Sequence, residues 1–426
     1  MSSDKPSHPF DADLQERGEY LLADTEFDTD LGMELARDAQ RVVSGELSEQ
    51  AFYEKHHEAV LDEFGEDTRV LSGDPTKWED EKHEDGPSGL VQALTDLTKK
   101  DELPRREAMK KGGFAAGALA LGLSGNGSIA AEDGSDEASS ADAESVASSD
   151  GGGDEGTQWG MVLNLNNCDG CLACVVACKQ ENSTSRGVRW MYVLAYEEDR
   201  QDDENFLVRP CQHCSNAPCE KVCPVGARHT RKKDGIVLTD YDVCIGCRYC
   251  EVACPYGVNY FQWGEPDTPY EELEHTHDER GRWVDSRPPE GVMGKCTFCP
   301  QRQDGMKGEE KIGTAACEDA CAMDAIHFGD MNDPESDPNT HLRQYKNDQE
   351  NDQSQFPNRK EHTVSTFRLL EERGTEPNVV YVGNEPSPHA EQVDGPITYE
   401  DVGLIDNRTE EVLSGSKTTE TGGERA

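Results

Sequence analysis

Short apolar runs alternate with polar, cysteine-bearing loops over residues 157–331 of this 426-residue chain. Short runs that are rich in β-branched and aromatic side chains are typical of buried strands. The pattern predicts strands over Met161–Leu165, Arg189–Ala195, Gly235–Leu238, Val258–Trp263 and Ala325–Phe328. Short helical stretches lie between them, so we expect an α+β domain built from small modules.

Residues 1–100 are polar, but apolar side chains recur there at helical intervals. Val60 and Phe64 are four residues apart and would lie on one face of a helix. The periodicity predicts two short helices, over Leu31–Val43 and Ser48–Phe64. We therefore expect an N-terminal segment that is helical in two places and otherwise irregular.

Residues 101–130 have the composition of a targeting signal, with Arg105 and Arg106 before the apolar run Phe114–Leu123. The run is too short to span a bilayer comfortably. The segment resembles a twin-arginine signal, which exports proteins already folded around their cofactors. Export predicts a protein on the outer face of the cytoplasmic membrane, held there through partner subunits.

The segment also departs from a usual twin-arginine signal. Pro104 stands where a hydroxyl residue is usual, Ala108 replaces phenylalanine, and about a hundred residues precede the arginine pair. An arginine pair before a buried core helix is the alternative, and it would leave the protein on the cytoplasmic face.

Two further segments have the composition of irregular chain. Residues 131–156 contain small and acidic residues with no lysine or arginine, so they bury too little apolar surface to offset chain entropy and predict a flexible linker. Residues 332–426 are again acidic, with apolar patches at Phe367–Leu370 and Val379–Val382. We expect a largely irregular C-terminal extension beyond the cysteine-bearing domain.

The charge of the chain is strongly one-sided. There are 41 basic and 87 acidic residues, a formal net charge of −46, and only 34% of residues are hydrophobic. This excess opposes binding to nucleic acid or to anionic lipid. Hydrated carboxylates keep a surface soluble in concentrated salt, where their repulsion is screened, so we interpret the protein as halophilic. An acidic protein of ordinary salt is the alternative, and stability after dilution of the salt distinguishes the two.

All 16 cysteines lie between Cys168 and Cys321. A disulfide framework would be spread over the chain, so this crowding indicates a metal-binding region. The cysteines form four groups with none left over: Cys168, Cys171, Cys174 and Cys178; Cys211, Cys214, Cys219 and Cys223; Cys244, Cys247, Cys250 and Cys254; and Cys296, Cys299, Cys317 and Cys321.

The spacing of these groups favours iron-sulfur clusters. The first and third groups read C-x2-C-x2-C-x3-C, as in bacterial ferredoxins, in which three thiolates bind one cluster and the fourth binds another. The other two groups show the same pattern with insertions. Paired C-x2-C units can also bind zinc, but a tetrahedral zinc site has no use for a third and a fourth cysteine so close behind.

Because the fourth cysteine of each group serves a second cluster, the groups must work in pairs. Two nested ferredoxin-like modules, an inner one at about 205–262 and an outer one at about 157–204 and 291–331, pair the second group with the third and the first with the fourth. The predicted ligand sets are Cys168, Cys171, Cys174 and Cys321; Cys296, Cys299, Cys317 and Cys178; Cys211, Cys214, Cys219 and Cys254; and Cys244, Cys247, Cys250 and Cys223. Pairing in sequential order, the first group with the second, is the alternative.

Between Trp159 and Asp330 the motifs resemble a known family. They read Cys-Asp-Gly-Cys-Leu-Ala-Cys from Cys168, Arg-Pro-Cys-Gln-His-Cys from Arg209, Asp-Val-Cys-Ile-Gly-Cys-Arg-Tyr-Cys from Asp242, Ala-Cys-Pro-Tyr-Gly from Ala253 and Lys-Cys-Thr-Phe-Cys from Lys295. This stretch resembles the four-cluster iron-sulfur subunits of the dimethyl sulfoxide reductase and polysulfide reductase family of molybdopterin oxidoreductases.

The resemblance implies four [4Fe-4S] clusters, because even Cys247 is kept where some members hold a three-iron cluster. It also implies a non-catalytic subunit that relays electrons between a molybdopterin-containing catalytic subunit and a quinone-linked membrane anchor in anaerobic respiration. We expect no catalytic residues and no membrane span in this chain. A freestanding soluble polyferredoxin carrier is one alternative, and the iron-sulfur subunit of a hydrogenase or formate dehydrogenase is another.

Other side chains near the cysteines carry weaker signals. Basic residues could raise cluster potentials locally or simply pair with carboxylates: Lys179, Lys221, Arg228, Arg248 and Lys295. We interpret His213 as a structural neighbour, because the cysteine sets are complete without it. His275 and His277 form an isolated H-x-H pair with no third ligand nearby, which is a weak basis for a metal site.

Overall fold

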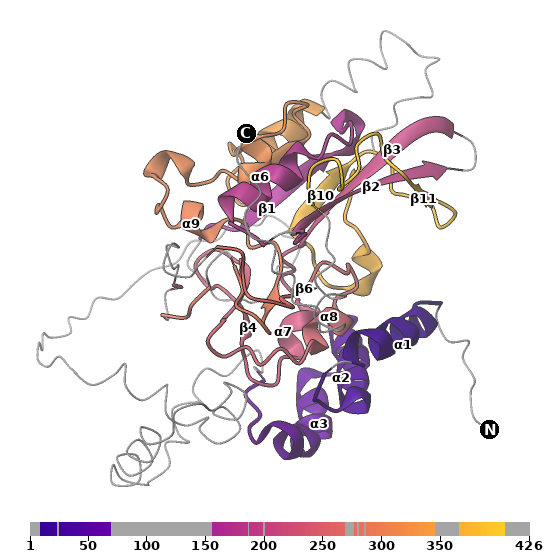
Figure 1. Cartoon of the computed structure of the whole chain (residues 1–426), viewed down its shortest axis with the longest axis vertical. Helices are drawn as coiled ribbons and strands as arrows, with labels where there is room; N and C mark the ends of the chain where they lie inside the picture. The colour runs from indigo at the N-terminus through magenta and orange to yellow at the C-terminus, as the bar shows by residue number, and fades with distance from the viewer. Residues whose placement is uncertain are drawn as a thin grey trace, which may run out of the picture. The chain divides into compact units, whose positions relative to one another are not determined.

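The computed structural model describes residues 9–23, 25–69, 156–185, 187–198, 201–268, 277–278, 281–284, 287–345 and 366–404 (Figure 1). The twin-arginine-like segment at 101–130, nearly all of the predicted linker and the last residues of the C-terminal extension lie outside these described residues.

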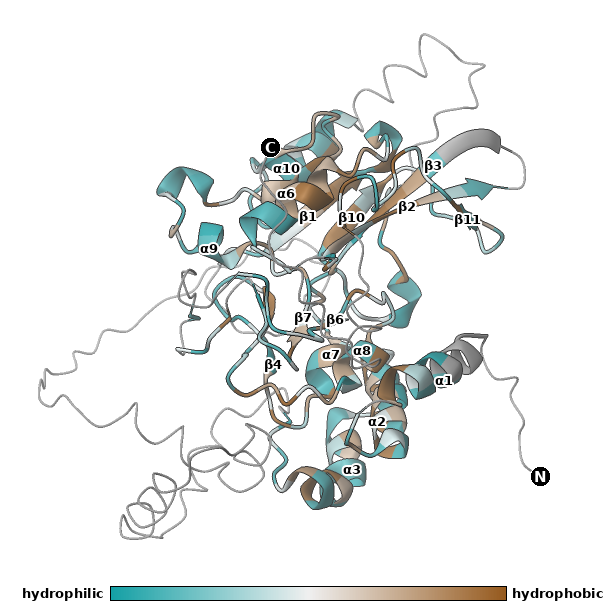
Figure 2. Ribbon diagram, viewed as in Figure 1, coloured by the Kyte–Doolittle hydropathy of each residue, from teal (hydrophilic) through white to brown (hydrophobic). Residues whose placement is uncertain are grey.

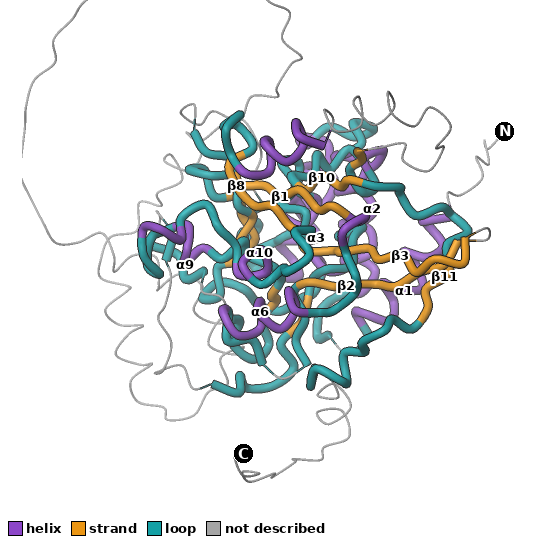
Figure 3. Tube along the Cα trace, turned by 90° about the horizontal axis from the view of Figure 1, so that it is seen from above, coloured by secondary structure: helices purple, strands orange, loops and turns teal. Residues whose placement is uncertain are grey.

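A four-stranded sheet joins the two ends of the cysteine-bearing region (Figure 3). Its strand β1 (Trp159–Asn164) is buried at every position and pairs antiparallel with β8 (Ile326–Asp330). The predictions of strands near residues 161–165 and 325–328 are therefore confirmed. Because β1 and β8 are neighbours, the first and last cysteine groups are brought to the same part of the molecule.

The same sheet corrects the predicted domain boundary at residue 331. Strand β10 (Val379–Val382) is completely buried, runs parallel to β1, and pairs on its other side with β9 (Thr366–Phe367). The apolar patches of the C-terminal extension are thus part of the sheet. The sequence does not predict this, because a run of four apolar residues carries no signal that specifies its partner strand.

The remaining strands form smaller sheets. Strand β2 (Met191–Glu198) pairs with β3 (Gln201–Pro210) and with β11 (Glu391–Val393), so the C-terminal extension contributes to a second sheet as well. Two ribbons complete the set: β4 (Arg228–Thr230) with β5 (Val237–Thr239), and β6 (Tyr260–Phe261) with β7 (Met293–Gly294). The strands predicted at Gly235–Leu238 and Val258–Trp263 exist but are only two or three residues long.

Short helices lie between these strands, and five of the sixteen cysteines belong to them. They are η1 (Leu165–Asn167), α6 (Ala173–Glu181), α7 (Pro218–Lys221), α8 (Tyr249–Ala253), α9 (Pro300–Gln303), η3 (Glu309–Lys311), α10 (Ala316–Asp319) and η4 (Glu371–Arg373). Apart from α6, none exceeds five residues. Such helices are too short to be stable alone, so what they pack against must hold them in place.

Among the described residues, three helices precede the cysteine-bearing region: α1 (Pro9–Leu22), α2 (Thr29–Val43) and α3 (Glu49–Phe64). The predictions of α2 and α3 are confirmed. The Asp28 side chain caps α2 by accepting a hydrogen bond from the Leu31 N–H at 2.8 Å, and the Ser48 side chain caps α3 in the same way. Helix α1 was not predicted, because its few apolar residues show no sustained helical period.

The three helices pack on the inner module, where we had expected a separate polar segment. Leu35 and Ala36 of α2 are fully buried in a core that also contains Tyr249 and Val252 of α8. Figure 2 shows α8 as an apolar element beside the N-terminal helices. The contact is close, since a Cβ added at Gly32 would lie 2.4 Å from the Tyr249 ring. Residues 9–69 therefore share one folded unit with the cysteine-bearing region.

Polar contacts tie the same helices to the loops around the cysteines. The Arg17 guanidinium donates to the Cys254 carbonyl oxygen at 2.8 Å, and the Tyr249 hydroxyl donates to the Asp28 carbonyl oxygen at 2.6 Å. In the part of the chain that the structure describes, no helix has both the length and the apolar character needed to cross a membrane.

The helix packing gives a first prediction. Leu35→Ala removes a fully buried side chain between α2 and the inner module, and should reduce the free energy of unfolding by about 2–5 kcal/mol. Leu61→Ala on α3 is the matched control, because Leu61 is 39% exposed and its loss should cost only about 0.5 kcal/mol. Denaturant unfolding followed by circular dichroism measures both. Equal effects would contradict the packing.

Candidate metal centres

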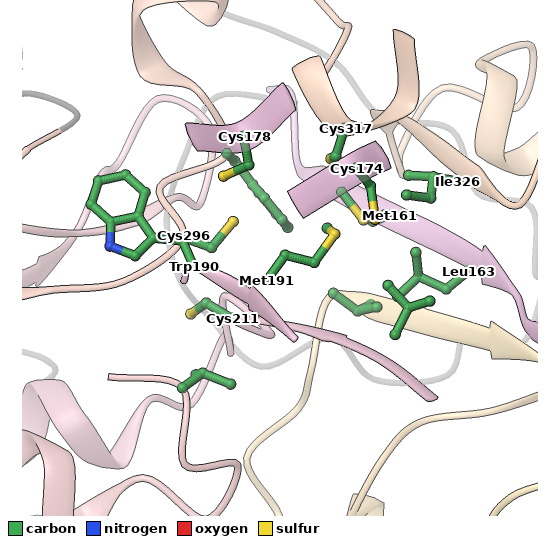
Figure 4. Close-up of a cluster of buried hydrophobic side chains, with 14 of the residues drawn as sticks. Met161, Leu163, Cys174, Cys178, Trp190, Met191, Cys211, Cys296, Cys317 and Ile326 are labelled. Carbon is green, nitrogen blue, oxygen red and sulfur yellow. The ribbon is translucent and has the colours of Figure 1, made fainter. Parts of the chain in front are cut away.

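All sixteen cysteines lie in the described part of the chain and none forms a disulfide. Eleven are buried and five are partly buried. Two cavities are lined by four cysteines each. One contains Cys178, Cys296, Cys299 and Cys317, and the other contains Cys211, Cys214, Cys219 and Cys254. Figure 4 shows Cys178, Cys296 and Cys317 beside Met161 and Trp190.

The other eight cysteines also gather into two sets of four. Burial raises the pKa of Cys174, and the neighbouring Cys168, Cys321 and Cys171 raise it further. Burial likewise raises the pKa of Cys247, and the neighbouring Cys223, Cys250 and Cys244 raise it further. Each of the four sets thus combines cysteines from two groups that are far apart in sequence. The structure brings together the same residues that nested pairing assigns to one site.

The four C-x2-C loops share one backbone conformation. The residue before the second cysteine has a positive φ in every loop, at Gly170 (72°), His213 (43°), Gly246 (71°) and Phe298 (56°). Glycine is required at Gly246, because a Cβ there would lie 2.1 Å from the Gly291 carbonyl oxygen. At His213 and Phe298 a larger residue adopts the left-handed conformation, at a cost of about 1–2 kcal/mol each.

The strained residues of the second and fourth groups stack on each other. The rings of His213 and Phe298 lie 3.7 Å apart with an interplanar angle of 22°. The imidazole Nδ1 also accepts a hydrogen bond from the Val237 N–H at 3.1 Å. Packing and hydrogen bonding therefore offset the backbone strain, and they join the inner module to the outer one at this point.

Hydrogen bonds to sulfur prepare several of the cysteines to bind metal. The Ala325 N–H lies 3.3 Å from Cys321 Sγ, and the Arg228 N–H lies 3.4 Å from Cys223 Sγ. The Asn182 amide donates to Cys178 Sγ at 3.5 Å and lies 4.0 Å from Cys299 Sγ. Donors of this kind stabilise thiolates.

Burial acts in the opposite direction. It raises the pKa of Cys168 to about 11 and the pKa values of Cys223 and Cys296 to about 12. The thiols would therefore remain protonated near neutral pH unless a metal replaced the protons. Sets of four such cysteines, with sulfur-directed donors, suit a metal centre and not a redox-active thiol pair.

Buried donors without partners support the same conclusion. Arg228 Nε and Nη1 and the Thr297 hydroxyl have no hydrogen-bond partner among the described residues. Such groups are costly unless something accepts their protons. The sulfides and thiolates of iron-sulfur clusters are acceptors of this kind, so the residues fit clusters that would supply one-electron transfer.

The four sets follow one another in space. Cys174 of the first set interacts electrostatically with Cys178 of the second. Cys296 of that second set interacts with Cys211 of the third, at the junction between the modules. Cys219 of the third set interacts with Cys250 of the fourth. Cysteines of the first and second, second and third, and third and fourth sets are therefore neighbours.

Comparisons with known proteins agree with this geometry. Residues 8–72 match a family model described as the N-terminal region of 4Fe-4S ferredoxin iron-sulfur binding, and residues 203–270 match a 4Fe-4S dicluster domain. A candidate iron-sulfur subunit of dimethyl sulfoxide reductase from Halobacterium salinarum is 37% identical over 248 residues, which cover 54% of this chain and 81% of that protein.

Two further relatives have the same kind of name. A selenate reductase subunit of Mesobacillus selenatarsenatis is 38% identical, with 53% of this chain and 72% of that protein covered. The menaquinone reductase iron-sulfur cluster-binding subunit of Nitratidesulfovibrio vulgaris is 34% identical, with 53% and 88% covered. The chain belongs to this family of iron-sulfur subunits. It is an electron-transfer subunit of a respiratory oxidoreductase with [4Fe-4S] ferredoxin domains.

In this iron-sulfur subunit the basic residues near the cysteines have different roles. Lys221 forms an ion pair with Glu49 of α3, and Arg248 pairs with Glu251 at 2.9 Å. Lys179 donates to the Thr184 carbonyl oxygen at 2.9 Å. Lys295 donates to carbonyl oxygens of Val237 and Cys296, and Arg228 contacts sulfur.

The structure describes two of the three histidines that the sequence analysis considers. The ring of His213 is buried against Phe298, and burial lowers its pKa well below the usual value, so the ring is neutral. His277 lies in a short bridge with Trp283, whereas His275 is outside the described residues. The H-x-H pair therefore stays a weak prediction.

Proposed function

We propose that the sixteen cysteines of this iron-sulfur subunit hold four [4Fe-4S] clusters in the nested ligand sets predicted above. The observation that carries the proposal is that the cysteines gather into four sets, and each set contains four cysteines drawn from two groups. Two of the sets line cavities, and the other two consist of cysteines that raise the pKa of one member. A shared donor supports the same pairing, since the Asn182 amide lies near both Cys178 Sγ and Cys299 Sγ. Sequential pairing has no comparable support among the described residues.

The succession of neighbouring sets supports a relay from one set to the next. We propose that the chain passes electrons between a molybdopterin-containing catalytic subunit and a quinone-linked membrane anchor. The names of the relatives, which include selenate reductase and menaquinone reductase subunits, support a fixed place in such a complex. A freestanding carrier needs no such succession of neighbouring sets.

We further propose that the subunit is exported by its twin-arginine-like segment and keeps its N-terminal helices. Cleavage after a small residue near Ala130 would separate residues 9–69 from the cysteine-bearing region. Those residues form a common core with α8 and hydrogen-bond to the Cys254 loop. Removal would expose that core, which is costly for an exported, folded protein. The strongly acidic composition supports function in concentrated salt.

The ligand sets can be tested with paired substitutions. Nested pairing places Cys178 with Cys299, so Cys178→Ser should remove the same EPR signal as Cys299→Ser, because both disturb one cluster. Sequential pairing would instead make Cys178→Ser resemble Cys214→Ser. The unsubstituted protein is the control and should contain about sixteen iron atoms for four [4Fe-4S] clusters. Tightly bound zinc or far less iron would contradict the cluster count.

Assembly with partners gives the next prediction. Affinity purification in detergent should recover the subunit with a molybdenum-containing polypeptide and a membrane polypeptide, and a quinol analogue should reduce its clusters within that complex. Metal analysis and EPR of the purified material measure these outcomes. Isolation as a lone soluble monomer from anaerobically respiring cells would contradict the proposal and favour a freestanding carrier.

Retention of the helices is tested by mass spectrometry of the mature protein. Peptides from α1–α3 should be present in the material isolated from membranes, because the helices are part of the folded core. Replacing Arg105 and Arg106 by lysine should leave the protein inside the cell if the pair is an export signal. A mature N-terminus near Ala131 would refute retention.

A further inference from the structure

Arg228 on β4 is a buried cation with an unusual set of neighbours. Its side chain is only 1% exposed, and its Nη2 lies 2.9 Å from Asn259 Oδ1 and 3.4 Å from Cys250 Sγ. Its backbone N–H donates to Cys223 Sγ at 3.4 Å. Within the described residues, the guanidinium makes no ion pair with a carboxylate, and Nε and Nη1 have no partner.

Two other buried arginines show what the chain does elsewhere. Arg231, three residues further along the chain, is fully buried but forms ion pairs with Asp234 and Asp304. Arg302 in the outer module pairs with Glu181 and Asp319. An unpaired buried charge is strongly destabilising, and a chain with 87 acidic residues could easily supply a partner. Because no described carboxylate pairs with Arg228, this cation needs a different counter-charge.

The cysteines of both inner sets supply that charge when they are thiolates. Arg228 Nη2 lies 3.4 Å from Cys250 Sγ of the fourth set. The same atom donates to Asn259 Oδ1, and Asn259 lines the cavity that holds the cysteines of the third set. Arg228 thus lies beside both inner sets.

We propose that Arg228 is the shared counter-charge of the two inner sets and that it raises the reduction potentials of both clusters held there. The inference rests on the proposed function, because it requires the inner sets to hold clusters. Reduction adds one electron, and hence one negative charge, to a cluster whose thiolates and sulfides are already negative. A fixed cation within hydrogen-bond reach of a ligand sulfur stabilises the reduced state more than the oxidised one.

The shared position has a second consequence. When one inner cluster is reduced, its charge disfavours reduction of the neighbouring cluster. A guanidinium beside both sets attracts each added electron and so offsets part of that repulsion, which lets an electron enter one inner site while the other is still reduced. Arg228 is therefore a positioning and tuning residue for transfer between the third and fourth sets and is not a ligand.

The test compares charge-changing variants by EPR-monitored redox titration of the full chain. The inner signals are first assigned by their loss in Cys214→Ser and Cys247→Ser. We expect Arg228→Gln to lower the midpoint potentials of both inner signals and to leave the outer signals unchanged. Arg228→Lys keeps the charge but not the fork geometry and should give a smaller shift. Lys232→Gln removes the same charge from an exposed position nearby and should shift none of the potentials.

Each outcome decides the question. Unchanged inner potentials in Arg228→Gln with a full iron content would overturn the proposal. If the inner sets take up clusters in the Arg228→Lys variant but not in the Arg228→Gln variant, those sets require the positive charge, and this result supports the proposal. Failure of both variants to load would mean that the residue acts by shape, and would also overturn it. If the unsubstituted protein shows no EPR signals from the inner sets, the result would instead contradict the proposed four-cluster function.

Discussion

The structure depends on one constraint: sixteen thiols must be held close together, in fours, away from water. Burial raises their pKa values, as for Cys168, so the folded chain disfavours the thiolates that metal binding needs. Little regular structure is available to enforce this arrangement, since every described helix around the cysteines except α6 has five residues or fewer. Metal binding and folding must therefore be coupled, with ligation energy replacing much of the core that a larger domain would have.

Two elements outside the cysteine-bearing region limit the entropy cost of that arrangement. Each set joins cysteines from distant groups, such as Cys168 and Cys321, so a long loop must close before a site exists. The antiparallel pairing of β1 with β8 brings the two ends of the region together without any metal, and β10 extends this sheet by pairing with β1. Helices α1–α3 cover α8 in the inner module. The outer module is thus held by a C-terminal strand and the inner module by N-terminal helices.

The sequence was most informative where chemistry fixes spacing. The cysteine spacing predicts iron-sulfur centres and the groups that share them, because ligation demands given residues at given intervals. Helices α2 and α3 could be predicted from period and caps such as Asp28. The roles of Val379–Val382 and of the N-terminal helices could not be predicted in this way, because a short apolar run does not specify what it packs against. Arg228 was one of five basic residues near ligands, and its contact with sulfur in place of a carboxylate became visible only in the fold.

The distribution of charge explains why such a buried cation matters. The exterior carries a large excess of carboxylates, and their field would disfavour reduction of anything inside. Salt screens charges at the surface over a few ångströms, so in concentrated salt neither the surface carboxylates nor surface lysines can set a buried potential. Groups such as Arg228 and Lys295 are shielded from ions by their burial, and their effect persists at any salt concentration. Interior cations that face sulfur can therefore tune the centres of an acidic electron-transfer protein whatever the salt concentration around it.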